Sequence, residues 1–305
     1  MNATTHFFTS TIHSQLQRDP WTDEMLALWV PVVVYWVYSV AFHFVMKAEI
    51  PFFEQFRIHT SDDMRKRNRV SVRRVLVMVA LQQMAQVLMG IAILQPVDPE
   101  VQALQQDAAL AQLTHQIYSW MSAFDEGFYP TANLLAKLIY WGLIPACQFF
   151  AAMVIMDAHQ YFLHRLFHIN KFLYKHIHSH HHRLYVPYAF GALYNHPLEG
   201  FMLDTLGATL AFELTGMSAR TSMVFFTFST MKTVDDHCGY ALPWDPLQYF
   251  FGNNVEYHDI HHQPYGIKKN FSQPFFTFWD KLLGTELPVS QAKKGSDKKA
   301  VSKTD

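Results

Sequence analysis

Long apolar runs separated by charged loops dominate the first half of the chain. The first run, MLALWVPVVVYWVYSVAFHFVM, covers residues 25–46, and two more cover about 75–94 and 134–156. About 20 apolar residues in a helix cross the roughly 30 Å hydrocarbon core of a bilayer. The pattern therefore predicts three membrane-spanning helices. Three glutamines weaken the apolar character of the second run, namely Gln82, Gln83 and Gln86.

A fourth apolar stretch covers residues 200–231, but polar and flexible residues interrupt its middle, among them Glu213, Gly216 and Arg220. Charged residues are costly inside a bilayer, so a single straight span is disfavoured. A hairpin that turns near LTGMSAR fits the sequence better. The chain is therefore predicted to be an all-α polytopic membrane protein with about four transmembrane helices, some of them paired as a hairpin.

Charge is scarce and unevenly placed. Only 16% of the 305 residues are charged and 50% are hydrophobic, whereas an average soluble domain has about 25% charged residues. The loop after the first run, RIHTSDDMRKRNRVSVRR, is basic, whereas residues 95–136 contain no Lys or Arg. The positive-inside rule places the basic loop in the cytosol and the acidic loop on the lumenal side. The third span then reaches the cytosol near Asp157.

This pattern divides the chain into four parts. Residues 1–24 are polar and lack the features of a cleaved signal peptide, and residues 25–156 hold the three spans with their basic and acidic loops. Residues 157–285, including the apolar hairpin 200–231, are predicted to form the catalytic region, and residues 286–305 a lysine-rich disordered tail. No nucleic-acid-binding motif is present. Two cysteines are too few for a disulfide framework or a cysteine-based metal site.

Three histidine clusters follow the third span. They read HRLFH, HSHHH and HDIHH, and their histidines are His164, His168, His178, His181, His182, His258, His261 and His262. Residues at i, i+3 and i+4 share one face of a helix, so each cluster is predicted to aim its imidazoles at one point. His180 falls outside this spacing, and His159 and His176 are interpreted as surface or supporting groups.

Two single histidines are further candidates. His237, in TVDDHCGY, follows the apolar hairpin and is expected beside the third cluster as an added ligand. His196, in ALYNHPLEG, is a metal or substrate contact, or else a helix-start residue beside Pro197. One zinc ion takes four ligands, so eight or more histidines indicate two metal ions in a cytosolic helical cap.

The identity of the metal is left open by the ligand type, because imidazole suits zinc, copper, iron and nickel. HRLFH has Arg165 where a zinc protease of the H-E-x-x-H type needs its glutamate. Five carboxylates near the clusters are candidates to orient ligating imidazoles through their second N–H, namely Asp157, Glu199, Asp235, Asp236 and Asp259, and of these Asp157, Asp236 and Asp259 are preferred. A metal pair beside apolar helices suits oxidation of a lipid C–H bond, with the alkyl chain in an apolar tunnel.

These clusters resemble those of the fatty acid hydroxylase superfamily. The longer phrases LYKHIHSHHHRLYVPYAFGALYNHPLEG and NNVEYHDIHHQPYGIKKNFSQPFFTFWDKLLGT resemble the sphinganine C4-hydroxylases, which form phytosphingosine-type bases in sphingolipid biosynthesis. The resemblance extends over about residues 156–285. It implies ligand roles for the eight clustered histidines and for His237.

The resemblance also implies two iron ions, with zinc as the alternative occupant of isolated protein, and O2 and NADPH as co-substrates. The substrate would be a long-chain sphingoid base or ceramide, and the location the endoplasmic reticulum membrane with a cytosolic active site. The chain has no HPGG haem-binding phrase and no Gly-rich nucleotide motif. Electrons would therefore come from a separate cytochrome b5 or reductase. The alternatives are a sterol or fatty acyl desaturase or oxidase of the same superfamily, a metal transporter, and a structural zinc protein.

Overall fold

The computed structural model describes residues 19–94, 97–123 and 126–292. In these residues all regular structure is helical, and β-pairing is limited to an isolated bridge between Arg57 and Tyr240. The predicted all-α class is confirmed. Most of the predicted N-terminal segment 1–24 and most of the predicted tail 286–305 lie outside the described residues.

In the described part of the chain, three helices are long and apolar enough to cross a membrane. They are α2 (Asp23–Ala48), α5 (Val72–Ile93) and a continuous helix, Tyr129–Ile169, built from α7 (Tyr129–Leu138), the π-helical turn η2 (Ile139–Leu143) and α8 (Ile144–Ile169). Thr22 and Ser71 cap α2 and α5 by accepting hydrogen bonds from backbone N–H groups. The three predicted spans are all present.

The third helix is longer than predicted, with 41 residues. At 1.5 Å per residue it is about twice as long as the roughly 30 Å core of a bilayer. It therefore extends beyond the membrane and carries His164 and His168 on the same rigid element. The membrane part and the first histidine cluster are thus joined without a loop.

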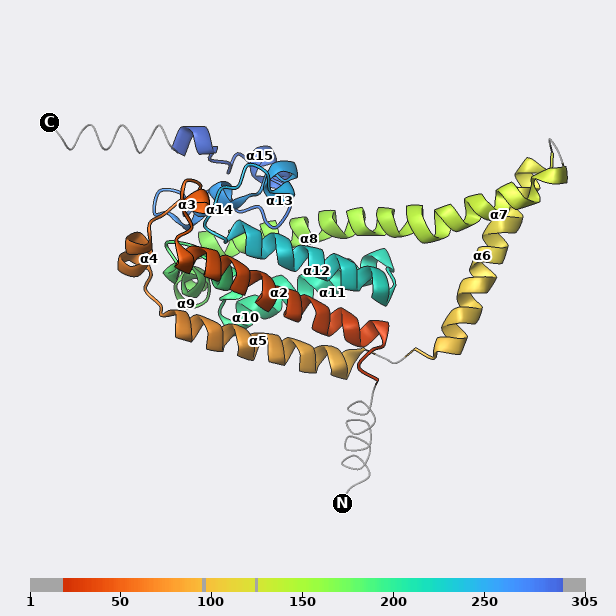
Figure 1. Cartoon of the computed structure of the whole chain (residues 1–305), viewed down its shortest axis with the longest axis horizontal. Helices are drawn as coiled ribbons and strands as arrows, with labels where there is room; N and C mark the ends of the chain where they lie inside the picture. The colour runs from red at the N-terminus through yellow and green to blue at the C-terminus, as the bar shows by residue number, and fades with distance from the viewer. Residues whose placement is uncertain (1–18, 95–96, 124–125, 293–305) are drawn as a thin grey trace, which may run out of the picture.

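The fourth apolar stretch forms the predicted hairpin. Its first arm joins α10 (Pro197–Gly200), the π-helical turn η5 (Phe201–Thr205) and α11 (Leu206–Thr215), and its second arm is α12 (Ala219–Asp236). The turn lies at Gly216, whose φ of 59° suits glycine. Arg220 pairs with Asp23 at 3.1 Å. Figure 1 shows α12 beside α2, and α11 packs against α8.

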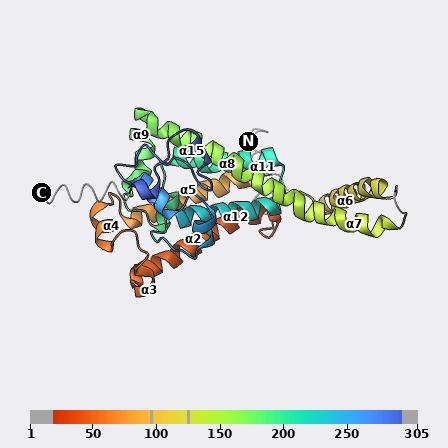
Figure 2. The same ribbon diagram turned by 90° about the horizontal axis from the view of Figure 1, so that it is seen from above.

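The predicted lumenal loop 95–136 is largely helical. Within it, α6 (Pro99–Met121) begins at the N-cap Asp98 and packs against α7, and the short η1 (Glu126–Phe128) follows it. Pro99 and the run of Ala, Leu and Gln residues favour a helix. The absence of Lys and Arg predicted only that this segment lies on the lumenal side, and it carried no information on secondary structure. The two helices form an arm that projects from the other helices (Figures 1 and 2).

The three glutamines of α5 make contacts between helices. Nε2 of Gln82 lies 3.3 Å from Oδ2 of Asp204, and Nε2 of Gln86 lies 3.1 Å from Oγ1 of Thr205. Oε1 of Gln83 accepts a hydrogen bond from the indole N–H of Trp36 at 2.8 Å. Polar side chains inside membrane helices commonly serve such contacts. The residues that weakened the apolar pattern therefore hold α5 against α2 and the hairpin.

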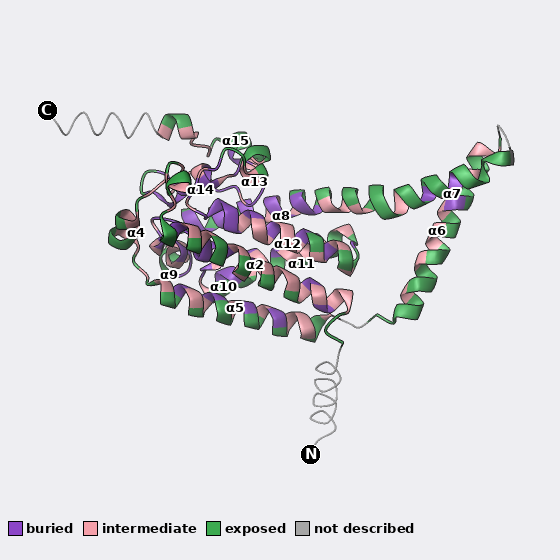
Figure 3. Ribbon diagram, viewed as in Figure 1, coloured by how far each residue is buried: buried purple, intermediate pink, exposed green. Residues whose placement is uncertain are grey.

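Short helices and loops form a cap at one end of the long helices. The cap contains α3 (Pro51–Glu54), α4 (Ser61–Arg67), α9 (Lys171–His176), η3 (His178–Arg183), η4 (Ala189–Leu193), α13 (Pro246–Phe250), α14 (Val255–His262) and α15 (Phe278–Leu282). Buried residues gather at this end of the molecule, whereas α6 and α7 are largely exposed (Figure 3).

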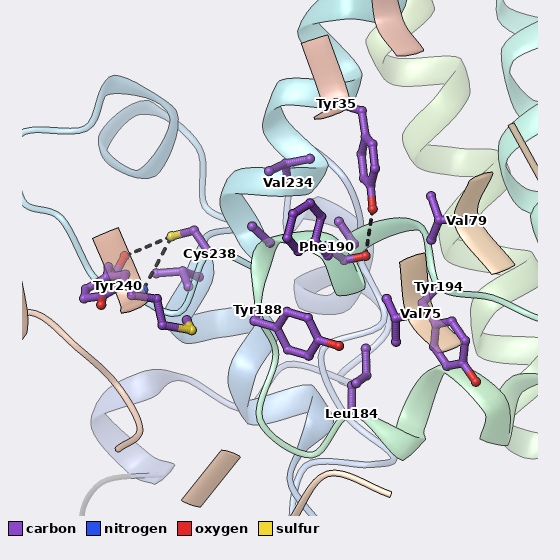
Figure 4. Packing of buried hydrophobic residues seen from close by; sticks show 14 of the residues in the cluster. Tyr35, Val75, Val79, Leu184, Tyr188, Phe190, Tyr194, Val234, Cys238 and Tyr240 are labelled. Atoms are coloured by element: carbon purple, nitrogen blue, oxygen red, sulfur yellow. Dashed lines mark hydrogen bonds between the residues drawn. The ribbon is translucent and has the colours of Figure 1, made fainter. Parts of the chain in front are cut away.

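A hydrophobic cluster joins the cap to the long helices. Figure 4 shows Tyr35 of α2, Val75 and Val79 of α5, and Val234 of α12 around Phe190 of η4. The hydroxyl of Tyr35 donates a hydrogen bond to the carbonyl oxygen of Phe190 at 2.7 Å. The cap is therefore fixed to three long helices from different parts of the chain.

Candidate metal centre

Nine buried histidines of the cap form two groups in which the candidate ligand atoms lie within 4.8 Å of one another. The first group contains His164, His168, His178, His182 and His261, and the second contains His181, His237, His258 and His262. All nine candidate ligands predicted from the sequence are thus brought together. His159, His176 and His180 lie outside both groups, as expected.

The first group is formed by histidines from three elements, α8, η3 and α14. Residues at i and i+4 of α8 bring Nε2 of His164 and Nε2 of His168 to 3.1 Å. From η3, Nε2 of His178 lies 2.7 Å from that of His168, and Nε2 of His182 lies 2.9 Å from that of His178. The ring of His261 on α14 lies 4.6 Å from the rings of His164 and His168.

The second group joins α12, η3 and α14. His237 follows the last residue of α12, and its Nε2 lies 3.0 Å from Nε2 of His258. Nε2 of His262 lies 3.1 Å from that of His258. The ring of His181 lies 4.7 Å from the ring of His262. The placement of His237 agrees with its prediction as an added ligand beside the third cluster.

The expectation that each cluster aims at one point fails for the second and third clusters. HSHHH lies on a 3₁₀ helix, where residues three apart share a face but stand about 6 Å apart along the axis. The rings of His178 and His181 are accordingly stacked 5.8 Å apart, one in each group. On α14, His261 belongs to the first group, whereas His258 and His262 belong to the second. These two clusters therefore link the groups.

The second nitrogen of most of these rings contacts a backbone carbonyl. The pairs are Nδ1 of His164 with Phe271, His181 with Tyr194, His237 with Thr233, His261 with Lys269 and His262 with Leu184, at 2.7–3.1 Å. A carbonyl oxygen only accepts, so Nδ1 must carry the proton in these rings and Nε2 presents a lone pair. Lone pairs that converge in a buried space need a cation between them. The donor set therefore fits two metal ions.

Burial also favours the neutral ring that a metal requires. Loss of water around a charged imidazole lowers the pKa of His178, His237 and His261 to about 3 and that of His181 to about 4. The pKa of His258 and that of His262 are also lowered by burial, and neighbouring imidazoles lower them further. These rings are therefore neutral at physiological pH.

The three preferred carboxylates have partners other than the grouped histidines. Asp157 accepts hydrogen bonds from the backbone N–H groups of Phe275 and Phe276 at 3.0 and 2.7 Å. Asp236 pairs with Lys232 and Asn253, and Asp259 contacts His59 and Gln263. These three carboxylates thus hold the surrounding loops, because backbone carbonyls occupy most of the second nitrogens.

Glu199, one of the five predicted carboxylates, contacts a grouped histidine. Its Oε1 accepts a hydrogen bond from Nδ1 of His178 inside the cap. Glu199 was among the nearby acidic residues in the sequence, but its spacing to the clusters gave no reason to prefer it. The chain brings it into contact through the start of α10.

His196 lies outside both groups. Its Nδ1 accepts a hydrogen bond from the backbone N–H of Leu198 at 3.2 Å, which caps the start of α10. Its ring lies 5.2 Å from that of His180. The structure therefore supports the helix-start interpretation.

Asp280 is a buried residue that the sequence search missed. It accepts hydrogen bonds from the hydroxyl of Tyr257 at 2.8 Å and from the backbone N–H of Phe271 at 3.1 Å. The carbonyl of Phe271 contacts Nδ1 of His164. Asp280 thus fixes a loop that orients a candidate ligand. Its phrase FWDKLLGT contains no histidine, so a search for ligands passes over it.

A small cavity of about 40 Å³ adjoins both histidine groups. His178 of the first group lines it together with His181, His237 and His258 of the second. Most of the remaining lining is polar, in contrast to the apolar tunnel expected from the sequence. The polar residues are Gln160, Asn195, Glu199, Asp204, Thr233, Asp236, Asn253 and Gln273.

Comparison with known proteins agrees with this arrangement. Residues 149–285 match the family model described as fatty acid hydroxylase. A sphingolipid C4-hydroxylase of Schizosaccharomyces pombe is 48% identical over 88% of this chain and 90% of its own, and a sphinganine C4-monooxygenase of Arabidopsis thaliana is 46% identical over 90% and 92%. A very-long-chain aldehyde decarbonylase of Oryza sativa is 42% identical over 89% and 93%. No solved structure matches.

The matched region contains all nine grouped histidines, and the relatives align with the membrane helices as well as the cap. With identities above 40% over nearly the full length, the chain belongs to the fatty acid hydroxylase family of membrane enzymes.

Proposed function

We propose that the chain is a sphinganine C4-monooxygenase, which adds a hydroxyl group at C4 of a sphingoid base to form a phytosphingosine-type base. The observation that carries the proposal is the position of the cavity against both groups of histidines. A substrate carbon in this cavity lies beside two metal sites. The names of the relatives from S. pombe and A. thaliana specify the lipid class and the position of oxidation.

Two iron ions are the proposed occupants of the histidine groups, with His164, His168, His178, His182 and His261 around one and His181, His237, His258 and His262 around the other. Bound iron would supply the activation of O2 that an unactivated C–H bond requires. One oxygen atom enters the C4–H bond, and the other leaves as water after two electrons and two protons are taken up. NADPH is the proposed source of these electrons.

A separate cytochrome b5 or reductase is the proposed electron donor, and the basic loop is its proposed contact surface. The loop residue Arg67 contacts Gln263, which follows the last histidine of α14. The backbone N–H of Arg69 donates to the carbonyl of Arg183, at the end of η3, at 2.8 Å. The loop therefore lies directly over two ligand-bearing segments. Its positive charge suits an acidic donor.

The endoplasmic reticulum membrane is the proposed location, with the cap in the cytosol. The basic loop between α2 and α5 lies at the cap end of the helices, and the positive-inside rule assigns such loops to the cytosolic side. This orientation also gives a soluble NADPH-dependent donor access to the metal centre.

Lipid profiling tests the proposed reaction. The chain would be expressed in cells that lack C4-hydroxylated long-chain bases, together with a working electron donor, and the bases would be analysed by mass spectrometry. Phytosphingosine is the expected new lipid. A product with only a double bond would favour a desaturase, and consumption of a very-long-chain aldehyde without a C4-hydroxylated base would favour the activity named for the rice relative. Absence of any new lipid from well-expressed protein would contradict the proposal.

A metal transporter is disfavoured by the position of the histidines. Both groups lie in the cap at one end of the helices. A structural zinc site would need no more than four ligands, whereas one group alone offers five.

A further inference from the structure

The cavity beside the histidine groups offers buried acceptors with no partner. Oε2 of Glu199 and Oδ1 of Asn253 have no hydrogen-bond partner, although the two side chains are only 1% and 0% exposed. Both residues line the cavity. An unsatisfied buried polar atom is costly, so these acceptors call for a ligand that donates hydrogen bonds.

Asp204 adds an anchored carboxylate to the same cavity. Its Oδ2 lies 3.3 Å from Nε2 of Gln82 and 3.5 Å from Nδ2 of Asn195. It stands on η5, a π-helical turn between α10 and α11, and such turns are frequent at functional sites. Asp204 belongs to neither histidine group.

Gly200 makes the approach of Gln82 possible. A Cβ atom at this position would collide with the amide group of Gln82. The polar end of Gln82 therefore occupies the space above a glycine and reaches Asp204 from the neighbouring helix α5. Polar residues within a membrane helix are functional candidates by default. This contact gives a reason for a glutamine in an otherwise apolar run.

No Lys or Arg of the described residues lines the cavity. The nearest buried cation, Lys232, is paired with Asp236 and donates to the carbonyl of Asn253 at 2.8 Å. Of the carboxylates that line the cavity, Glu199 contacts His178 and Asp236 pairs with Lys232, whereas Asp204 contacts the neutral amides of Gln82 and Asn195. The positive metal ions proposed for the histidine groups would repel a cationic group. Such a group would therefore be directed toward Asp204.

We infer that Asp204, held by Gln82 and Asn195, binds the charged amino group of a free sphingoid base and so makes the free base the preferred substrate over its N-acylated form. This inference rests on the proposed function and specifies its substrate. An ammonium group carries three N–H donors, and the nearby hydroxyl groups of the base supply further donors for Glu199 and Asn253. An N-acylated base has no positive charge and keeps only one N–H at this nitrogen. Its acyl carbonyl is a further acceptor, so it cannot donate to the unpaired oxygens of Glu199 and Asn253.

The test compares sphinganine with N-acetylsphinganine, which keeps the hydroxyls and the alkyl chain but lacks the positive charge. With the purified holoenzyme and its electron donor, kcat/KM of the wild type is expected to favour sphinganine. Asp204→Asn keeps the shape and removes the charge. It is expected to lower kcat/KM for sphinganine by about 10- to 100-fold, as for loss of a charged hydrogen bond, and to change kcat/KM for N-acetylsphinganine by less than about threefold.

Two further measurements separate recognition from structure. Equilibrium binding of radiolabelled sphinganine should weaken in Asp204→Asn, while the metal content per protein stays at the wild-type level. Glu213→Gln removes an exposed carboxylate from α11 of the same hairpin arm and serves as the matched control with unchanged preference. Asp204→Glu should retain part of the preference, because it keeps the charge.

The outcomes distinguish this inference from the proposed function. Equal turnover of both substrates by the wild type, or an equal loss of both in Asp204→Asn, would overturn the role of Asp204 while phytosphingosine formation still supported the hydroxylase. Failure of the wild type to hydroxylate either substrate with a working donor would overturn both.

Discussion

Nδ1 of His178 and the carboxylate of Glu199 are joined by a hydrogen bond in the interior of the cap. Because Nδ1 is engaged in this way, Nε2 of His178 faces Nε2 of His168 at 2.7 Å. The carboxylate thus sets the orientation of a ring at the centre of the first histidine group. Its other oxygen, Oε2, has no hydrogen-bond partner among the described residues, and Glu199 lines the cavity beside both groups.

Glu199→Ala is expected to lower metal affinity about 10- to 100-fold, the usual effect of losing a partner that orients a ligating histidine. Glu199→Gln keeps an oxygen that can accept from Nδ1 and should retain most of the metal. Metal per protein, measured by mass spectrometry after dialysis against a chelator, checks this order. The exposed Glu213→Ala is the control, and wild-type metal content in Glu199→Ala would contradict the assigned role.

His261→Ala is expected to abolish turnover, whereas His180→Ala should largely spare it. Nε2 of His261 belongs to the first group, is buried and has no hydrogen-bond partner. His180 is half-buried and lies outside both groups. Product formation and metal content of the two purified variants provide the measurement. An equal loss in both variants would mean that the register of the second cluster differs from the one described.

Eight of the nine ligand candidates could be predicted from the spacing of the histidines, and His237 from its position after the apolar hairpin. The division of the nine between the two groups could not be predicted. The division depends on the 3₁₀ geometry of η3, which separates His178 from His181 along the helix axis, and on α14, which contributes to both groups. The carbonyl partners of the rings were also invisible in the sequence, because any residue can supply a carbonyl.

The helical class, the three spans and the hairpin turn could be predicted from apolar run lengths and from Gly216. The helix α6 was missed because the charge argument distinguishes membrane sides and gives no information on local structure. The role of Gln82 required the fold, since its partner Asp204 lies 122 positions further along the chain. Side chains that meet only through tertiary packing leave no spacing signal.

The free energy of unfolding of the metal-free protein should decrease as the pH falls from about 6.5 to about 3. Burial lowers the pKa of His178, His181, His237 and His261 to about 3 or 4, against about 6.5 in the unfolded chain. Between these values the unfolded chain binds more protons, so stability falls as the pH falls below about 6.5 and the effect ends near pH 3. Thermal unfolding of metal-free protein in detergent from pH 8 to pH 4 should show this decline. A flat profile would contradict it.

Gly266→Ala should disrupt the third cluster, because a Cβ atom at Gly266 would collide with the carbonyl oxygen of Ile260, which lies on α14 between His258 and His261. A backbone atom cannot move aside as the end of a flexible side chain can. The helix α14 must therefore shift, and its histidines, which belong to both groups, would shift with it. We expect a lower unfolding temperature and loss of metal from both groups. Gly142→Ala is the matched control, since no atom lies within 4 Å of its added Cβ. Equal behaviour of the two variants would show that this packing does not position α14.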